Sequence, residues 1–168
     1  MARYQSPFAI VLALLAVSAL SACGGGDASG AAPDFSLTAR DGGTVTLSGQ
    51  KGRVVLLNFW ATWCDSCKEE LPALEELQRT PAGDRFELLA VSVDDDPAKV
   101  VPLFAALHHM SYRILYADRR TMDAFAVRML PTSFLIAPDG TIARRYVGPL
   151  DARAVQNDIL SLLNRRPS

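Results

Sequence analysis

The sequence predicts a mixed α/β sandwich built around one sheet, and two observations carry that prediction. Apolar, β-branched runs of strand length alternate with helix-compatible stretches along most of the chain. The last two predicted strands follow each other as a hairpin, and a closing helix comes after them. Strand–helix units that end in this way give a sheet with both parallel and antiparallel neighbours.

The first expected elements are a hairpin, a buried strand and a helix. Two short strands are expected within Phe35–Leu47, around the turn Asp41-Gly42-Gly43. Val54–Trp60 is apolar and rich in β-branched and aromatic residues, so it should be a buried central strand. A helix is predicted over Cys64–Arg79, and Pro72 should kink it after its first two turns.

The remaining elements continue the alternation of strands and helices. The closing helix is amphipathic, with Asp151 as its expected N-cap and with Ala154, Ile159, Leu160 and Leu163 on its inner face. We expect strands at Phe86–Val93, Tyr112–Tyr116, Ser133–Ile136 and Thr141–Val147, and helices at Pro97–His108, Met122–Ala126 and Asp151–Leu163.

The N-terminus has the pattern of an export signal. Its apolar stretch, Phe8–Leu20, is too short for an ordinary membrane span. The stretch ends in Leu20-Ser21-Ala22-Cys23, which resembles the lipobox of bacterial lipoproteins. This resemblance implies a signal peptide at 1–22, a lipidated Cys23 with a flexible tether at 23–32, and one folded domain at 33–168. An ordinary signal peptide with a chance cysteine, or a retained span, are the alternatives.

Composition and cysteine count narrow the function. The formal net charge is −1 and no basic stripe is present, so nucleic acid is not an expected partner. The chain has three cysteines, and if Cys23 carries lipid, Cys64 and Cys67 remain. A disulfide between them would close too short a loop to stabilise a domain of this size. Redox chemistry or metal binding explains the pair better.

The position of the pair favours redox chemistry. Cys64 comes just after the carboxyl end of the predicted central strand and at the start of the predicted helix. Free backbone N–H groups and the helix dipole stabilise a thiolate there. Cys67 falls one turn further along, close enough to attack a mixed disulfide on Cys64. This is the arrangement that a reversible dithiol/disulfide pair needs.

Several motifs in order along the chain resemble those of a known family. The segment Asn58–Cys67 resembles the active-site segment of thioredoxin-fold proteins, and more narrowly that of the membrane-tethered TlpA/ResA/CcmG type. Ala32–Phe35 and Lys51–Val55 match the family pattern ahead of it. Leu130–Ile136 resembles the cis-proline loop with its strand, and Pro138–Gly140 matches the turn that follows.

The resemblance implies a thioredoxin-like fold: a central mixed sheet with helices on both faces, an N-terminal β-hairpin, and an inserted strand–helix unit within Asp94–Ala117. It implies thiol–disulfide exchange, usually as a reductant, with no cofactor and no metal. Expected clients are exported thiol or disulfide proteins, including apocytochrome c before haem attachment and copper-site assembly factors. A membrane dithiol carrier would donate electrons. We expect a monomer, lipid-anchored to a bacterial membrane and facing the periplasm or the cell exterior.

The resemblance also assigns roles to residues. Cys64 would be the nucleophile, with an exposed sulfur of lowered pKa, and Cys67 the buried resolving thiol. Pro131 matches the family's cis-proline, which would place the backbone of Leu130 beside the cysteines, where it can pair with an extended client. Trp63 would cover the disulfide and shape the client surface.

Three further residues near the cysteines bear on proton transfer and redox direction. Glu70 stands where the family often carries an acidic residue, and it could pass a proton to Cys67. The alternative is that Glu70 lies on a solvated helix face. Asn58 takes the place of the buried Asp of thioredoxin itself. Asp65 puts a negative charge next to Cys64, which should oppose its thiolate and favour a reductant.

Two other classes of function remain as alternatives. One is a copper chaperone on the same fold, with His108, His109 and Met110 as candidate ligands. Such chaperones usually separate their cysteines by three residues, whereas two residues separate them here. The other is a thiol peroxidase, but Leu57 and Ala61 stand where those enzymes tend to have Pro and Thr.

Overall fold

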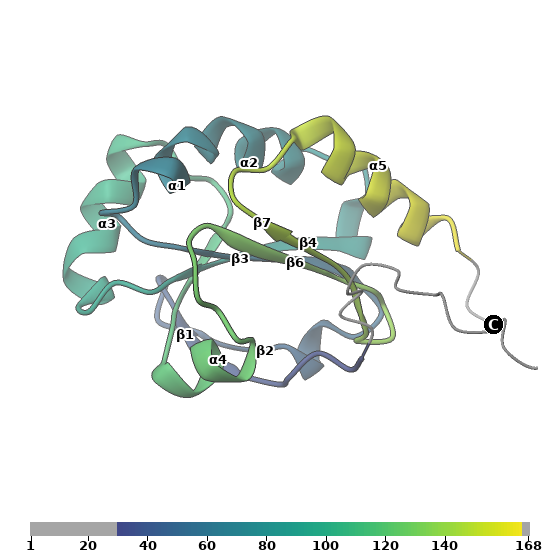
Figure 1. Cartoon of the computed structure of the whole chain (residues 1–168), viewed down its shortest axis with the longest axis horizontal. Coiled ribbons are helices and arrows are strands. Elements are labelled where there is room, and N and C mark those ends of the chain that lie inside the picture. The colour runs from purple at the N-terminus through teal and green to yellow at the C-terminus, as the bar shows by residue number, and fades with distance from the viewer. Residues whose placement is uncertain (1–29, 166–168) are drawn as a thin grey trace, which may run out of the picture.

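The computed structural model describes residues 30–165, which form one seven-stranded mixed sheet. The strand order is β2-β1-β5-β4-β3-β6-β7, and β3, β4 and β5 run parallel while the other pairs are antiparallel (Figure 1). The strands are β1 Ser36–Ala39, β2 Thr44–Thr46, β3 Val54–Trp60, β4 Phe86–Ser92, β5 Arg113–Tyr116, β6 Thr132–Ile136 and β7 Ile142–Val147.

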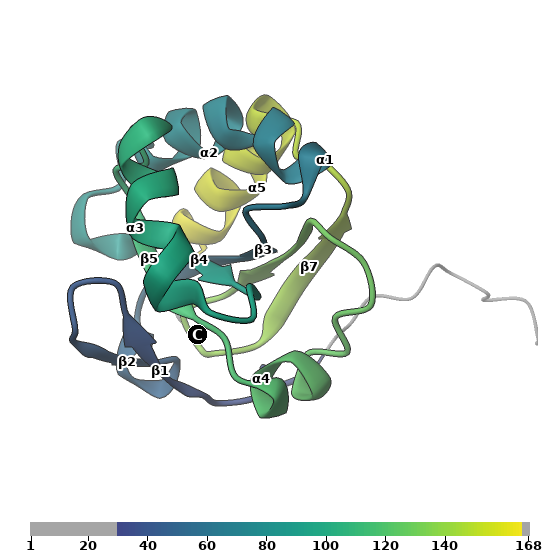
Figure 2. The same ribbon diagram turned by 90° about the vertical axis from the view of Figure 1, so that its left-hand side faces the viewer.

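Helices cover both faces of the sheet. Figures 1 and 2 show α1, α2, α3 and α5 on one face and α4 on the other. Their bounds are α1 Asp65–Glu69, α2 Leu71–Gln78, α3 Pro97–Leu107, α4 Arg119–Ala124 and α5 Ala152–Leu163, with short 3-10 turns at Ser48–Gln50 and Gly83–Arg85. The predicted fold class is confirmed, including the N-terminal hairpin β1–β2. The strand–helix unit expected within Asp94–Ala117 is present with its order reversed, since helix α3 comes first and strand β5 follows. Within the described residues, no helix combines the length and the apolar character that crossing a membrane requires.

Strand β3 is the centre of the molecule, because all seven of its residues are buried. Its side chains alternate between the two faces. Leu56 and Trp60 pack in the core beneath α2, α3 and α5, whereas Leu57 and Phe59 pack in the core on the α4 side. Burying a large apolar side chain contributes about 1.5–3 kcal/mol. The strand that delivers the CxxC segment is therefore held from both faces.

The single kinked helix predicted over Cys64–Arg79 is instead two helices. Glu70 separates the two helices: it follows the last residue of α1 and precedes the first residue of α2, two residues before Pro72. The reason is local: Pro72 lies in the first turn of α2, where a missing backbone N–H costs nothing. The proline thus starts a helix instead of bending one. The consequence for the site is that Glu70 lies at a helix junction and not on a continuous helical face.

Two other predictions need correction. The helix expected at Met122–Ala126 begins earlier, at Arg119, because the side chain of Asp118 accepts a hydrogen bond from the Thr121 N–H. Asp151 caps α5 as predicted, through a 2.9 Å bond from the Ala154 N–H. The inner face of α5 was assigned wrongly in part: its buried residues are Val155, Ile159 and Leu162, while Ala154 is exposed and Leu160 and Leu163 are half-buried.

The described chain begins at the opposite end of the sheet from the cysteines. Ala31 forms an isolated bridge with Thr141, and the Ala32 N–H donates to the Gly140 carbonyl at 2.9 Å. This β6–β7 turn lies at the start of β3, where the Gly52 N–H donates to the Pro138 carbonyl. Cys23 and the predicted signal peptide, 1–22, lie outside the described residues.

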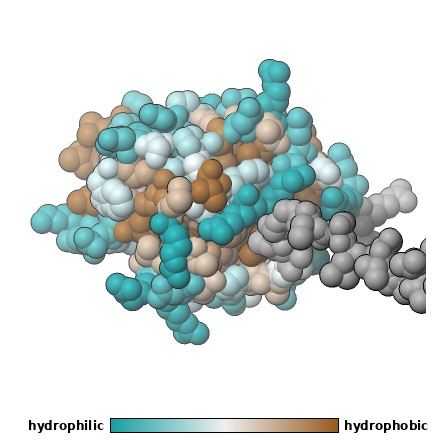
Figure 3. All heavy atoms as spheres, in the orientation of Figure 1, coloured by the Kyte–Doolittle hydropathy of each residue, from teal (hydrophilic) through white to brown (hydrophobic). Residues whose placement is uncertain are grey.

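The surface is mixed in polarity, with apolar side chains gathered over α3. Figure 3 shows apolar and polar residues interspersed over one face of the molecule. Three of the exposed large apolar residues, Val100, Leu103 and Leu107, come from α3. Two others, Trp63 and Met129, lie close in sequence to the cysteines and to the predicted cis-proline.

Candidate active site

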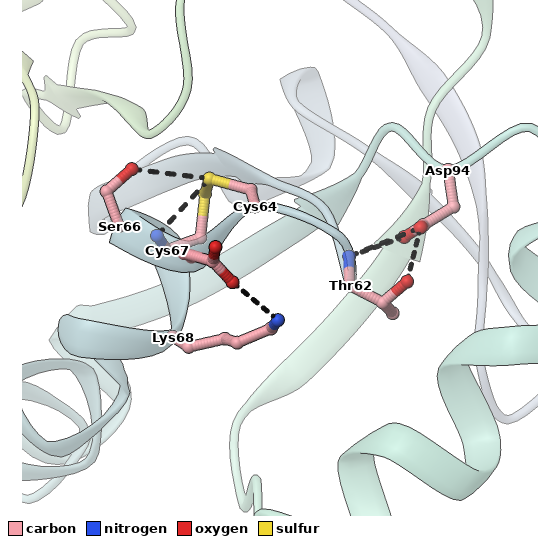
Figure 4. Close-up of polar contacts among 7 residues, drawn as sticks. Thr62, Cys64, Ser66, Cys67, Lys68 and Asp94 are labelled. Carbon is pink, nitrogen blue, oxygen red and sulfur yellow. Dashed lines mark hydrogen bonds and ion pairs between the residues drawn. A yellow bond between two sulfur atoms is a disulfide. The ribbon is translucent and has the colours of Figure 1, made fainter.

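The site is built around a disulfide between Cys64 and Cys67. Cys64 is the last residue before α1 and acts as its N-cap, and Cys67 lies within the helix. The sulfur of Cys64 accepts a hydrogen bond of 3.2 Å from the backbone N–H of Cys67 (Figure 4). The same N–H, which has no partner within the helix, favours the Cys64 thiolate once the disulfide is reduced. The two Cα atoms are 5.3 Å apart, within the usual range for a disulfide.

Both cysteines are buried in the disulfide form. Cys64 is 7% exposed and Cys67 is 1% exposed. The expectation of an exposed Cys64 sulfur therefore does not hold for the oxidised chain. The hydroxyl of Ser66 lies 3.5 Å from the sulfur of Cys64 and also 3.5 Å from the carbonyl oxygen of Leu130. These contacts come from neighbouring groups that a sequence pattern does not position.

The predicted proline loop lies against the CxxC segment. The peptide bond between Leu130 and Pro131 is cis, and the Leu130 carbonyl faces the hydroxyl of Ser66. The side chain of Thr132 closes the loop by donating to the Met129 carbonyl at 2.7 Å. Trp63, immediately before Cys64, is 66% exposed. The loop contacts the CxxC segment through Ser66, and the exposed Trp63 precedes Cys64 in the chain.

Glu70 is buried and hydrogen-bonded, which excludes the solvated-face interpretation. Its carboxylate accepts from the Asn58 side-chain amide at 2.7 Å and from the Leu150 N–H at 3.2 Å, and the residue is 1% exposed. Burial raises the pKa of Glu70 to about 7, although both hydrogen bonds act in the opposite direction. A carboxyl group with that pKa can both release and accept a proton near neutral pH.

Asn58 connects Glu70 to the rest of the core. Its amide nitrogen donates to Glu70 and also to the hydroxyl of Ser133 on β6, at 2.9 Å. Its amide oxygen is buried without a hydrogen-bond partner among the described residues. Two strands and the α1–α2 junction therefore meet at one side chain. Sequence reasoning noticed Asn58 only as a missing aspartate and did not assign it to Glu70.

A second polar cluster holds the loop between β3 and Cys64. The carboxylate of Asp94 accepts from the Thr62 hydroxyl at 2.6 Å and from the Thr62 N–H at 3.2 Å (Figure 4). It also accepts from the Ser92 hydroxyl at 2.8 Å. Sequence reasoning missed this contact. A signal was present, because Asp94 and Thr62 each follow the end of one of two parallel strands, and the carboxyl ends of parallel neighbours meet at one edge.

The charge of Asp65 is partly neutralised. The Lys68 ammonium lies 2.8 Å from its carboxylate, and this hydrogen bond and the lysine's charge hold the pKa of Asp65 below its usual range. Both groups are on the solvent side of α1, where such pairs are weak. The predicted repulsion between Asp65 and a Cys64 thiolate is thereby reduced.

The candidate copper ligands do not gather around the cysteines. His108 caps the end of α3 and stacks on Phe104, with ring centroids 4.2 Å apart, and Met110 is buried. His109 follows in a left-handed conformation with φ of 53°. Within residues 30–165, no group of three or more His, Cys, Asp and Glu residues could hold a metal ion. The metal-binding alternative gains no support from this arrangement.

The fold and the site define a class of protein. A CxxC disulfide at the end of a central strand, facing a cis-proline loop on a mixed α/β sheet, is the site of a thioredoxin-like thiol–disulfide oxidoreductase. Comparison with known proteins supports this class. ResA, the thiol-disulfide oxidoreductase of Bacillus subtilis, is 33% identical over 132 residues, which cover 79% of this chain and 73% of ResA.

Solved structures agree. A protein assigned as the thiol:disulfide interchange protein DsbE of Chlorobium tepidum has a TM-score of 0.75 and 31% identity, and the match covers 82% of this chain and 99% of that one. The exposed lipoprotein thioredoxin of Streptococcus pneumoniae has a TM-score of 0.69 and 28% identity, covering 77% and 100%. Residues 28–145 match the model of the AhpC/TSA family. The chain belongs to the AhpC/TSA family, as a thioredoxin-like thiol–disulfide oxidoreductase related to ResA and DsbE.

Proposed function

We propose that this protein is an extracytoplasmic thiol–disulfide oxidoreductase that mainly reduces disulfides in exported proteins. One observation carries the proposal: the Cys64–Cys67 pair is flanked by the exposed Trp63 and by the cis-proline loop at Pro131. In addition, Glu70, whose pKa is about 7, is hydrogen-bonded to Asn58 on β3, the strand that leads to the pair. This combination offers a nucleophile, a surface for a polypeptide and a proton carrier. The similarity to ResA, a thiol-disulfide oxidoreductase, and to a thiol:disulfide interchange protein supports the same chemistry.

In the proposed reaction, Cys64 and Cys67 begin as a dithiol. The Cys64 thiolate attacks one sulfur of the client disulfide, and the other client sulfur leaves as a thiolate that takes up a proton. The Cys67 thiol loses its proton and attacks Cys64, which releases the second client sulfur. The client gains two electrons and two protons, and the pair becomes the disulfide seen in the structure. A membrane dithiol carrier would return it to the dithiol.

Glu70 is the proposed proton carrier for the second step. Cys67 is 1% exposed, so its proton needs a route through a protein group. Glu70 is the buried carboxyl group that follows it by three residues, and its pKa of about 7 suits it to accept a proton from a thiol. Hydrogen bonds from Asn58 and Leu150 hold it in place.

Trp63, Leu130 and Pro131 form the proposed client-binding surface. Trp63 offers exposed apolar area, and the cis bond at Pro131 leaves the Leu130 backbone beside the CxxC segment. An extended client could pair with that backbone, as in other strand-addition modes of recognition. We propose apocytochrome c and metal-site proteins as the client class.

The proposed location is outside the cytoplasm, on a lipid anchor at Cys23. The lipobox-like segment and the tether at 23–32 support this location, as does the similarity to a lipoprotein thioredoxin. The folded domain, 33–168, is proposed to act as a monomer with protein clients and without nucleic acid.

The reduction potential of the Cys64–Cys67 pair tests the proposed direction. The full chain with Cys23→Ser retains only these two cysteines, so the couple can be equilibrated cleanly with glutathione. A potential well below about −200 mV is expected for a reductase. A potential near about −120 mV would make the protein an oxidant and would overturn the reductase proposal.

A further inference from the structure

We propose that the hydroxyl group of Ser66 is a redox-dependent hydrogen-bond donor that stabilises the Cys64 thiolate. The inference deepens the proposed function and rests on Cys64 being its nucleophile. Ser66 is half-buried within α1, between the two cysteines. Figure 4 shows its hydroxyl directed at the sulfur of Cys64. No other side-chain hydroxyl of the described residues contacts either cysteine sulfur at hydrogen-bond distance.

The hydroxyl stands between two acceptors at equal distance. Its oxygen is 3.5 Å from the Cys64 sulfur and 3.5 Å from the carbonyl oxygen of Leu130. A serine hydroxyl has one proton to donate, so it can serve one acceptor well at a time. Rotation of the hydroxyl, without any movement of the backbone, is enough to change the acceptor.

The redox state of Cys64 decides which acceptor is stronger. A disulfide sulfur is neutral and accepts hydrogen bonds weakly, so in the oxidised chain the Leu130 carbonyl is the better acceptor. When the disulfide is reduced, Cys64 can carry a full negative charge. Hydrogen bonds to ionised acceptors are shorter and about twice as strong as neutral ones. The Ser66 hydroxyl then turns toward Cys64, where the backbone N–H of Cys67 already donates.

Two consequences follow for the reaction. A second donor lowers the pKa of Cys64 and raises the fraction of thiolate available for attack. It also counters the charge of Asp65, which Lys68 neutralises only in part at the solvent surface. In addition, the hydroxyl leaves the Leu130 carbonyl when the chain is reduced. That carbonyl is then free for the backbone of a client in the state that attacks the client.

Four substitutions in the Cys23→Ser chain test the proposal. Ser66→Ala removes the hydroxyl, while Ser66→Thr and Ser66→Val have the same shape and differ only in its presence. Ser161→Ala, on the exposed side of α5, removes a hydroxyl far from the site. The measurement is the pKa of Cys64 in the reduced chain, from the pH dependence of its alkylation by iodoacetamide.

We expect the pKa of Cys64 to rise by about one unit in Ser66→Ala and Ser66→Val, a tenfold change in the ionisation constant. Ser66→Thr and Ser161→Ala should retain the original value. Equal values for the Thr and Val variants would overturn the proposal, and this pair decides even if the Ala variant folds poorly. The titration needs no client, so it is independent of the proposed function. That function fails separately if the reduced unsubstituted chain does not exchange with glutathione disulfide.

Discussion

The amide nitrogen of Asn58 lies 2.7 Å from a carboxylate oxygen of Glu70 and links strand β3 to the junction of α1 and α2. Both residues are fully buried. An ionised carboxylate in such a place needs donors, and it has two, the amide of Asn58 and the N–H of Leu150. The same carboxylate keeps a raised pKa because burial outweighs them. The pair therefore fixes the position of a buried carboxyl group that can hold a proton, three residues after Cys67 in the chain.

Replacing Glu70 with Gln should slow disulfide reduction and remove its dependence on pH near neutrality. The group whose pKa is about 7 no longer titrates, so Cys67 loses its proposed proton acceptor. We expect a loss of about 10²-fold in the rate of release from the mixed disulfide. The matched control is Glu69→Gln, because Glu69 is the exposed neighbour on α1. The pH profile of single-turnover reduction is the measurement, and an unchanged profile would remove Glu70 from the mechanism.

The same substitution should change how stability depends on pH. The carboxyl group of Glu70 titrates near 4.5 when unperturbed and near 7 in the fold, so between these values the folded chain retains a proton that the unfolded chain has lost. As the pH rises from about 4.5 to about 7, the free energy of unfolding should therefore fall by about 3 kcal/mol. Urea unfolding of the oxidised chain at pH 5 and pH 8 measures it. Glu70→Gln should abolish this contribution, whereas Glu69→Gln should preserve it.

Removing the side chain of Asn58 should raise the pKa of Glu70 further. Asn58→Ala deletes one of the two donors that favour the ionised form, so the inflection in the pH profile should move upward from about 7. Ser133→Ala is the control, since the Ser133 hydroxyl contacts the amide of Asn58 and not the carboxylate of Glu70. An inflection that stays in place in Asn58→Ala would show that the Asn58 amide does not set this pKa, which burial and the Leu150 N–H would then determine.

The two cysteines should fail in different ways. Cys64→Ser should abolish exchange, because no nucleophile remains at the N-cap of α1. Cys67→Ser should still attack clients but should not resolve the product, so it should accumulate covalent mixed disulfides. These can be captured from an extracytoplasmic extract and resolved on a non-reducing gel. If reductant-sensitive adducts form with Cys64→Ser instead, the assignment of the two roles is reversed.

Asp94 should matter for the stability of the loop that leads to Cys64. Asp94→Asn weakens three hydrogen bonds to Thr62 and one to Ser92, and a cost of about 1–3 kcal/mol is expected. Asp95→Asn is the matched control, because Asp95 is exposed. Equilibrium urea unfolding of both variants is the measurement. Equal stability of the two would show that Thr62 is held by the backbone without help from Asp94.

Much of the fold was predictable because the sequence is locally consistent with it. The apolar run Val54–Trp60 had to be a buried strand, and the cysteines had to follow its carboxyl end. The break at Glu70 was not predicted, because Pro72 can either bend a helix or begin one, and the sequence pattern does not distinguish these outcomes. Because Pro72 begins a second helix, Glu70 lies at a helix junction and is buried, whereas a continuous helix was compatible with a solvent-exposed Glu70.

The sequence predicts which residues belong to the site better than it predicts the contacts between them. Cys64, Cys67, Pro131 and Glu70 were identified from spacing and resemblance, but their partners come from distant segments. Ser133 lies 75 residues from Asn58, and Leu130 lies 64 residues from Ser66. Such pairs depend on strand register and loop packing. Local sequence patterns carry neither, which is why the hydroxyl beside the Cys64 sulfur and the contact between Asp94 and Thr62 emerged only from the structure.

The bridge between Ala31 and Thr141 has a consequence for orientation at a bilayer. The chain enters the domain at the start of β3, whereas Cys64 follows its end, and seven residues of strand span about 20 Å. If Cys23 carries the proposed lipid and β3 lies along the bilayer normal, the disulfide would point into the aqueous compartment. Diffusing clients would then meet the reactive end first. A membrane-embedded donor would have to place its own thiols above the lipid headgroups. Otherwise the domain would have to rotate on its anchor until the disulfide reaches the membrane surface.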